Sequence, residues 1–408
     1  MKTKPPSPPL IPPLWTKAYT TFVFLNFFNF MGFYMLLSTL SLYLKGNSCS
    51  DTEIGIIIGS FTISSILSRI LSIPLAKSFG AVRVVRTGLI VFAIGTLFFF
   101  LIKAIPSYLA ARILEGAGFG VTSTLLISMV AQIIPPKRMA EGLGFMGLGT
   151  TVSMAIGPLF GLFVANEFGF ECMFSIMTMF TMISAAVTLM LPKINLFTSH
   201  AIQKPKGFHG LHLDLRPLPP SSLAFFYGIA ICSVTAYMAV FTANKHLPSA
   251  AIFFVTSTIG TMISRIFAGK LYDRHGHFVV IPPAAILLGS AFLLIVHSPL
   301  DRSHFIFFLS SIFYGLGIGA LFPAIQTLTL TSMPPEKRTS AAVVFYVFYD
   351  LGNGLGTVIL GFLAGLFGDY AYTYIASSIS LAILFLTYAF FFLWPKRRQA
   401  FEARAKLP

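Results

Sequence analysis

The sequence predicts an all-α integral membrane protein in which twelve transmembrane helices form two six-helix bundles. Hydrophobic residues make up 56% of the 408-residue chain and charged residues 10%, whereas about a quarter of a soluble domain is charged. Mostly apolar stretches of about 20 or more residues recur along the whole length, as helices that cross a ~30 Å hydrocarbon core require. Two segments of the first half recur in the second half in the same order, which indicates a duplicated bundle.

The spans are separated by proline, glycine and charged residues. A Pro-rich tail (1–17) precedes an N-terminal bundle (18–191), a central loop (192–220), a C-terminal bundle (221–394) and a basic tail (395–408). The first span is too long for the apolar core of a signal peptide, so we expect it to remain in the mature protein. The predicted spans are 18–44, 51–77, 84–102, 107–133, 139–166, 169–191, 221–244, 249–270, 278–297, 304–331, 339–367 and 370–394.

The basic residues between the spans predict the orientation. Twenty-one Lys and Arg residues fall in the loops and tails of one side, and the other side has only Lys45, Lys103, Lys245 and Arg302. This bias predicts that both termini are cytoplasmic, in the inner or plasma membrane of the cell. The net charge of +15 is therefore an orientation signal spread over short loops, and we expect no nucleic-acid partner.

The internal repeat covers two motifs. Gly116, Gly118 and Gly120 align with Gly315, Gly317 and Gly319, and Pro135-Pro136 align with Pro334-Pro335. The second motif places Arg69 over Arg265. Parallel halves joined by a longer loop suit a transporter that rocks one bundle against the other around a central site.

Several motifs resemble those of the major facilitator superfamily, over essentially all twelve spans. The loop from Gly269 to Gly276, GKLYDRHG, resembles the G-x-L-a-D-r-x-G signature, and IPLAKSFG at 73–80 resembles a degraded copy with Lys77 at the aspartate position. RILEGAG at 112–118 resembles the R-x-x-x-G-x-G motif of proton-driven members, and GPLFG at 157–161 resembles an element of antiporters. The resemblance implies the twelve-helix fold of this family and transport of a small molecule.

Three charged residues lie deep in predicted spans, and each is a candidate for proton coupling: Arg112, Glu115 and Asp350. Such residues cost roughly 2.5 to 3.5 kcal/mol near the bilayer centre, so we expect them to be paired inside the protein. Arg112 and Glu115 are three apart and share a helix face; the alternative to coupling is a static ion pair. Asp350 has a substrate or proton role, or is satisfied by neighbouring backbone and hydroxyl groups. Arg69 and Arg265 are close enough to the cytoplasmic helix ends to snorkel, and we expect anchoring and pairing between the halves for them rather than substrate contact.

The signature loops predict a gate. In the family each loop packs near the start of a helix in the opposite half, where an aspartate suits the positive helix end. Asp273, followed by Arg274, is then expected at the start of the fifth span, and Lys77 near the start of the eleventh, where Glu336 is an extra residue in the repeat alignment. We predict a Lys77–Glu336 contact in an inner latch. Gly157-Pro158 is expected to kink the fifth span and seal the interface against leak.

Polar and aromatic groups in otherwise apolar spans are candidates for a small-molecule cavity. They are Asn26, Asn29, Tyr34, Tyr237, Gln326, Tyr346 and Tyr349.

Together these features predict a monomeric secondary transporter that exchanges protons for a small organic molecule, driven by a proton gradient without a cofactor or a metal. A proton-coupled importer or a facilitator with the same fold is the alternative, and a non-transporting receptor or scaffold ranks below both. An enzyme is not expected, because the sequence has no HExxH, GxSxG or GxxxxGK[ST] motif.

Overall fold

The computed structural model describes residues 13–49, 51–101, 103–191, 216–301 and 304–394. Most of the predicted Pro-rich tail, most of the central loop and all of the basic tail lie outside these residues. The described part of the chain is nearly all helical and contains no strand. The long helices are α1 (Lys17–Gly46), α2 (Asp51–Phe79), α3 (Ala81–Leu101), α4 (Ile105–Ile133), α5 (Met139–Val187), α6 (Leu218–Asn244), α7 (Ala250–His275), α8 (Ile281–His297), α9 (Phe305–Thr331), α10 (Arg338–Phe367) and α11 (Ala371–Tyr388).

Helix α5 contains the fifth and sixth predicted spans. Its 49 residues correspond to about 74 Å of helix, more than twice the ~30 Å hydrocarbon thickness. Gly169 interrupts it with φ 84° and ψ 163°, a backbone conformation that is essentially restricted to glycine. The eleven labelled helices therefore make twelve crossings, and the predicted fold class is confirmed.

Prolines and glycines set several helix ends. Prolines occupy the first turns of α4, α6 and α8, where their missing N–H costs no helical hydrogen bond. Gly276 ends α7 and Gly368 ends α10, with φ of 81° and 70°, because a residue without Cβ reverses the chain direction at little cost. Pro158 lies inside α5, but the non-helical residue of α5 is Gly169.

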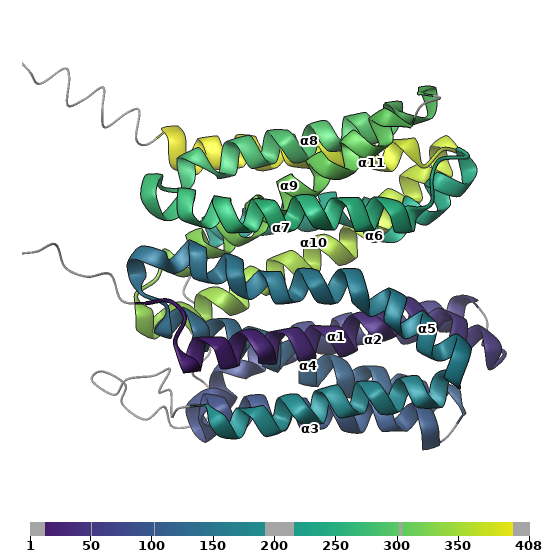
Figure 1. Ribbon diagram of the computed structural model, residues 1–408, viewed down its shortest axis with the longest axis vertical. Helices are drawn as coiled ribbons and strands as arrows, with labels where there is room; N and C mark the ends of the chain where they lie inside the picture. The colour runs from purple at the N-terminus through teal and green to yellow at the C-terminus, as the bar shows by residue number, and fades with distance from the viewer. Residues whose placement is uncertain (1–12, 50, 102, 192–215, 302–303, 395–408) are drawn as a thin grey trace, which may run out of the picture.

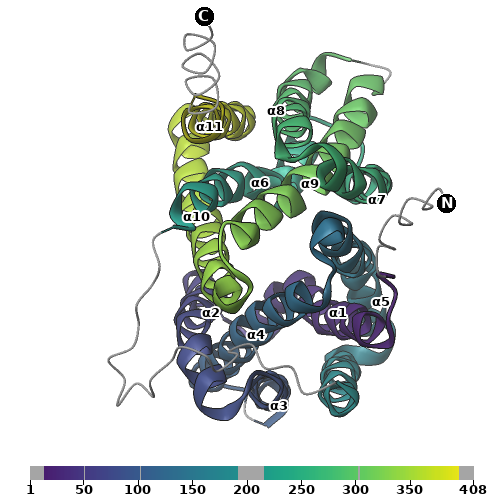
Figure 2. The same ribbon diagram turned by 90° about the vertical axis from the view of Figure 1, so that its left-hand side faces the viewer.

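The helices form two bundles, α1 to α5 and α6 to α11, which are stacked in the view of Figure 1. Contacts between the bundles run from α5 to α7 and from α10 to α2 and α4. In the end-on view of Figure 2, α5 lies beside α7, and α10 approaches α2 and α4. Helix α5 also contacts α9. At least four pairs of helices therefore build the interface between the halves.

The end of the molecule at which α2, α4, α7 and α9 end is called the basic end here, because it carries Lys77, Lys137, Lys270 and Lys337. A buried apolar cluster at this end draws residues from both halves, among them Met129 of α4 and Ala341 of α10. The other large apolar clusters each draw their buried residues from a single half. The two halves are therefore packed together at the basic end.

Candidate functional site

An ion pair joins the two halves at the interface. The Nε of Arg69, in α2, lies 2.8 Å from the Oδ2 of Asp350, in α10, and the two side chains are 4% and 15% exposed. Arg69 is ten residues from the end of α2 at Phe79, which is about 15 Å of helix. The Arg69 side chain does not snorkel to the surface. Its pairing with the opposite half, one of the two expected roles, is confirmed.

Neutral groups complete the coordination of Arg69. Its Nη1 donates to the hydroxyls of Ser123 at 2.8 Å and Thr124 at 3.0 Å, and its Cζ lies 4.5 Å from the ring centroid of Tyr346. The Tyr346 hydroxyl accepts a hydrogen bond from Gln326 at 3.1 Å. Two of the predicted cavity residues thus surround the ion pair. We call Arg69, Asp350, Tyr346 and Gln326 the central cluster.

A second arginine, Arg265, lies across the interface, and no salt bridge joins it to an acidic residue among those that the structure describes. It is partly exposed on α7, and a Cβ added at Gly147 of α5 would overlap its Nη1 and lie 2.7 Å from its Cζ. Within the part of the chain that the structure describes, its Nε has no hydrogen-bond partner. The phenol groups of Tyr34, Tyr227 and Tyr346 lie within electrostatic range of the guanidinium.

The Arg112–Glu115 pair forms inside the N-terminal half. The Nη1 of Arg112 lies 2.8 Å from the Oε2 of Glu115, with side chains 2% and 0% exposed. Thr96 of α3 donates to the other carboxylate oxygen at 3.1 Å, and the Cζ of Arg112 lies 4.3 Å from the ring centroid of Phe61 in α2. The neighbours are helices of the same half. The predicted pairing is present, and its part in proton coupling stays a prediction.

Three other predicted cavity residues make contacts inside one half. Asn26 donates to the Met146 carbonyl at 3.1 Å and to Thr150 at 2.8 Å, which ties α1 to α5. Tyr237 donates to the backbone of α10 within the C-terminal half. Tyr349 packs at 6.1 Å from the Tyr227 ring.

The remaining two candidates, Tyr34 and Asn29, lie on α1. Tyr34 is partly exposed and lies near Arg265. Asn29 is 3% exposed, and its Nδ2 has no hydrogen-bond partner among the described residues. A substrate role for each of the seven candidates stays a prediction.

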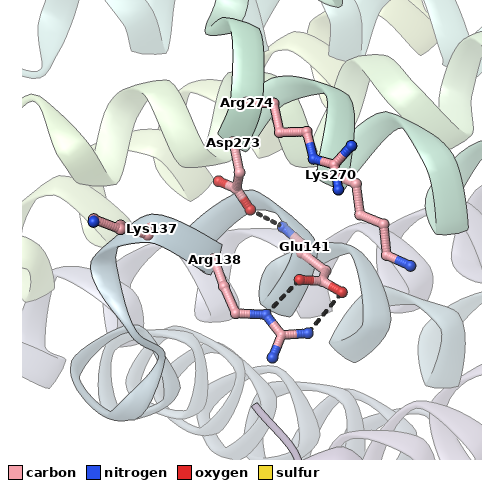
Figure 3. A pocket seen from close by; sticks show the side chains of 6 residues that line it. All are labelled: Lys137, Arg138, Glu141, Lys270, Asp273 and Arg274. Carbon is pink, nitrogen blue, oxygen red and sulfur yellow. Dashed lines mark hydrogen bonds and ion pairs between the residues drawn. The ribbon is translucent and has the colours of Figure 1, made fainter. Parts of the chain in front are cut away.

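At the basic end, Asp273 of α7 caps the start of α5. The backbone N–H groups of Ala140 and Glu141 donate to its two carboxylate oxygens at 2.9 and 2.8 Å, as Figure 3 shows for Glu141. Arg138 holds Glu141 through two hydrogen bonds of 2.6 and 2.9 Å. Asp273 therefore lies where the sequence placed it, and the negative charge meets the positive end of α5.

The Asp273 contact lies in a charged pocket between the halves. Its lining residues are Lys137, Arg138, Glu141, Lys270, Asp273 and Arg274. Lys270 and Arg274 extend from α7 beside Asp273, whose carboxylate points toward the start of α5 (Figure 3). A third contact joins the halves nearby, because Nη1 of Arg338 donates to the carbonyl of Ala131 at 2.6 Å.

The other gate residues occupy the expected elements. Lys77 is in the last turn of α2, and Glu336 is in the short 3-10 helix that precedes α10. Their predicted contact and their role in a latch stay predictions. A Cβ at Gly157 would lie 2.8 Å from the Cβ of Tyr34, so Gly157 allows close packing of α1 and α5 within one half.

The sequence did not show which residues surround the two interface arginines, Arg69 and Arg265. The repeat alignment placed Arg69 over Arg265, which was the available signal that both lie at equivalent depth. It did not reveal that Arg69 meets Asp350, or that Arg265 lies against Gly147 among tyrosines. Tyr227, Ser123 and Thr124 carried no signal, since hydroxyl groups are common in packed transmembrane helices.

Comparisons with known proteins agree with this architecture. The model of the Major Facilitator Superfamily matches residues 22–356 and 221–406. The uncharacterized MFS-type transporter MJ1560 of Methanocaldococcus jannaschii is 22% identical over 87% of this chain and 91% of its own length. The multi-drug resistance efflux pump PmrA of Streptococcus pneumoniae is 27% identical over 66% of this chain and 69% of its own.

A solved structure shows the same fold. The crystal structure of the human organic anion transporter MFSD10 (TETRAN) aligns with a TM-score of 0.78 at 15% identity, over 92% of this chain and 99% of that one. With eleven helices long and apolar enough to cross a membrane among the described residues, the chain is a multi-pass membrane protein. The chain belongs to the Major Facilitator Superfamily of membrane transporters.

Proposed function

We propose that this protein is a proton-coupled exporter of a small organic molecule, which works by alternating access. The observation that carries the proposal is the Arg69–Asp350 ion pair between the halves, 2.8 Å long and largely buried. Removing the charge of one partner leaves the other buried without compensation, which costs about 3 to 5 kcal/mol. A proton on Asp350 therefore weakens the contact that holds the halves together.

In this scheme the proton controls which end of the molecule opens. While Asp350 is ionised, it holds Arg69 and the basic end stays closed, together with the Asp273 contact at the start of α5. Protonation of Asp350 releases Arg69 to its hydroxyl partners, the basic end opens, and the proton leaves on that side. The ionised carrier then binds its substrate and returns it to the opposite side.

Asp350 is favoured over Glu115 as the coupling acid because of its position. Asp350 lies between the halves and is 15% exposed, whereas Glu115 is 0% exposed inside one half. Export is supported by the antiporter-like element at Gly157-Pro158 and by the efflux function named for the pneumococcal relative. With both termini cytoplasmic, as the basic loops predict, the described conformation is closed to the cytoplasm.

The test is transport by the purified protein in liposomes with an imposed pH gradient. Small organic compounds are screened with the wild type, and active compounds are measured again with Asp350→Asn and Glu115→Gln. An antiporter moves substrate against the direction of proton flow, and an importer moves it with the protons. We expect Asp350→Asn to abolish the response to the gradient. Transport that ignores the gradient, with both variants active, would refute proton coupling.

Orientation is tested separately with cysteines at the two ends. Lys103 and Lys137 are exposed at opposite ends of the molecule, so each is replaced by cysteine in a chain without native cysteines. A membrane-impermeant maleimide added to intact cells should label position 103 and not position 137. The reverse pattern would show that the basic end faces outward.

A further inference from the structure

The repeat provides the interface arginine twice and its acid once. Arg69 aligns with Arg265, and Lys137-Arg138 align with Lys337-Arg338. Continuing the second alignment places Thr150 opposite Asp350. Thr150 is uncharged, and its hydroxyl accepts a hydrogen bond from Asn26. The ion pair of one half therefore has no counterpart at Arg265.

Three carboxylates near the interface are engaged elsewhere. Asp350 pairs with Arg69, Glu141 pairs with Arg138, and Asp273 accepts from the start of α5. For Arg265, the described residues supply no carboxylate partner and no hydrogen bond to Nε. Because Arg265 is partly exposed, water reaches only part of its guanidinium, and the buried Nε is costly while it has no acceptor.

The surroundings of Arg265 combine a glycine backbone with tyrosine side chains. Gly147 has no side chain, and the guanidinium lies over its backbone, where any Cβ would displace it. Tyr34 of α1, Tyr227 of α6 and Tyr346 of α10 lie within electrostatic range of the guanidinium. Groups from both halves thus lie near a cation for which the described residues supply no carboxylate partner, which is the arrangement expected of a site that an anion completes.

We propose that Arg265 binds the anionic group, a carboxylate or sulfonate, of a small aromatic or amphipathic substrate, and that the three tyrosines contact its apolar body. The planar guanidinium donates two parallel hydrogen bonds to such a group. The inference rests on the proposed transport function and names its substrate class. Arg265 is then a binding residue, where the sequence alone indicated anchoring and pairing between the halves.

The first experiment measures binding to the purified full-length protein by thermal stabilisation. The probes are benzenesulfonate and naphthalene-2-sulfonate as permanent anions, benzenesulfonamide as a neutral analogue and phenyltrimethylammonium as a cation. We expect the sulfonates to stabilise the wild type. Arg265→Ala should weaken this binding about tenfold or more, since hydrogen bonds between charged groups are lost. Arg265→Lys should retain part of it.

A matched arginine controls for net charge. Arg83 is exposed in the basic end at the start of α3, and Arg83→Ala should leave sulfonate binding unchanged. If Arg265→Ala binds sulfonate as the wild type does, the inference is wrong. It is equally wrong if the wild type responds only to the neutral or cationic probe, or to none of the four.

A second test keeps the charge and moves it. Gly147→Ala forces the Arg265 side chain aside. Because the end of an arginine side chain is flexible, the protein should still fold. Gly149→Ala, two residues along α5, would place its Cβ 3.4 Å from the nearest atom, the Cβ of Phe27, and serves as the control. Sulfonate affinity should fall in Gly147→Ala and not in Gly149→Ala. Equal affinities would contradict the site.

Transport separates this inference from proton coupling. Sulfonate flux that requires Arg265 but ignores the pH gradient would retain the anion site and refute the coupling. Gradient-driven transport of neutral or cationic compounds that is undiminished in Arg265→Ala would retain the coupling and refute the anion site.

Discussion

Replacing Asp350 by Asn tests whether the ion pair between the halves holds the basic end closed. The substitution keeps the size of the side chain and removes its charge, so Arg69, 4% exposed in the pair, loses its compensation. Such a loss costs about 3 to 5 kcal/mol. Because Arg69 keeps its bonds to Ser123 and Thr124, we expect the lower end of this range. If the cost falls on the closed state alone, the ratio of open to closed molecules rises roughly a hundredfold.

The assay is the labelling rate of a cysteine buried where the halves meet. Met333 is 3% exposed and belongs to the apolar cluster shared by both halves at the basic end, so a maleimide reaches Met333→Cys only when that end opens. The three native cysteines, Cys49, Cys172 and Cys232, are replaced first. Labelling of the Asp350→Asn variant should be much faster than that of its parent.

The control is an ion pair of similar length elsewhere. Lys245 and Asp369 are 2.6 Å apart within the C-terminal half, and each side chain is 33% exposed. Exposed pairs contribute about 0 to 1 kcal/mol, so Asp369→Asn should hardly change the labelling rate. Equal rates for Asp350→Asn and Asp369→Asn would refute the idea that the interface pair controls opening. Relative to the intrinsic rate of a free thiol at the same pH, which falls with the thiolate fraction, acidification should accelerate labelling of the parent and not of Asp350→Asn.

Three further predictions concern helix packing and the gate. Gly116→Ala should lower the free energy of unfolding by about 1 to 3 kcal/mol, because the added Cβ would meet the backbone of α2. Gly354→Ala places its Cβ in open space and should not destabilise the protein. Equal melting temperatures of the two variants would contradict the packing. Asp273→Asn should weaken the capping of α5 by roughly 0.3 to 2 kcal/mol and raise the labelling of Met333→Cys, and an unchanged rate would exclude a role in closure. Reversing the charge of Lys77 or Glu336 alone should reduce transport in liposomes, and reversing both should restore it; if the double variant stays inactive, the pair is not a latch.

Most of the fold follows from composition and periodicity. Apolar stretches of membrane-spanning length fixed the spans, and the separation of 139–166 from 169–191 corresponds to the interruption of α5 at Gly169. The close spacing of Arg112 and Glu115 predicted their contact because both lie on one helix, where the spacing determines the geometry.

Contacts between helices were harder to predict. Asp350 and Arg69 were each recognised as unusual, yet a helical period indicates a face and not which helix of the other half it meets. Asn26 and Tyr237 bond backbone groups within one half, since a polar side chain in an apolar span serves helix packing as readily as ligand binding. Whether Arg265 meets an acid depends on which residues of the other helices lie opposite it, here Gly147 and tyrosines. The sequence does not show which helices meet.

Two arginines against one acid at the interface also give the protein an electrical property. While Asp350 is ionised it compensates Arg69, and a bound monoanion then neutralises Arg265, so the loaded centre carries no net charge. When Asp350 is protonated for the switching of the empty carrier, Arg69 and Arg265 leave the centre with two positive charges. One elementary charge gains or loses about 2.3 kcal/mol for each 100 mV of membrane potential that it crosses. The voltage across the membrane would then act on the switching of the empty carrier and hardly on that of the loaded one, so the membrane potential changes the rate of only one half of the transport cycle.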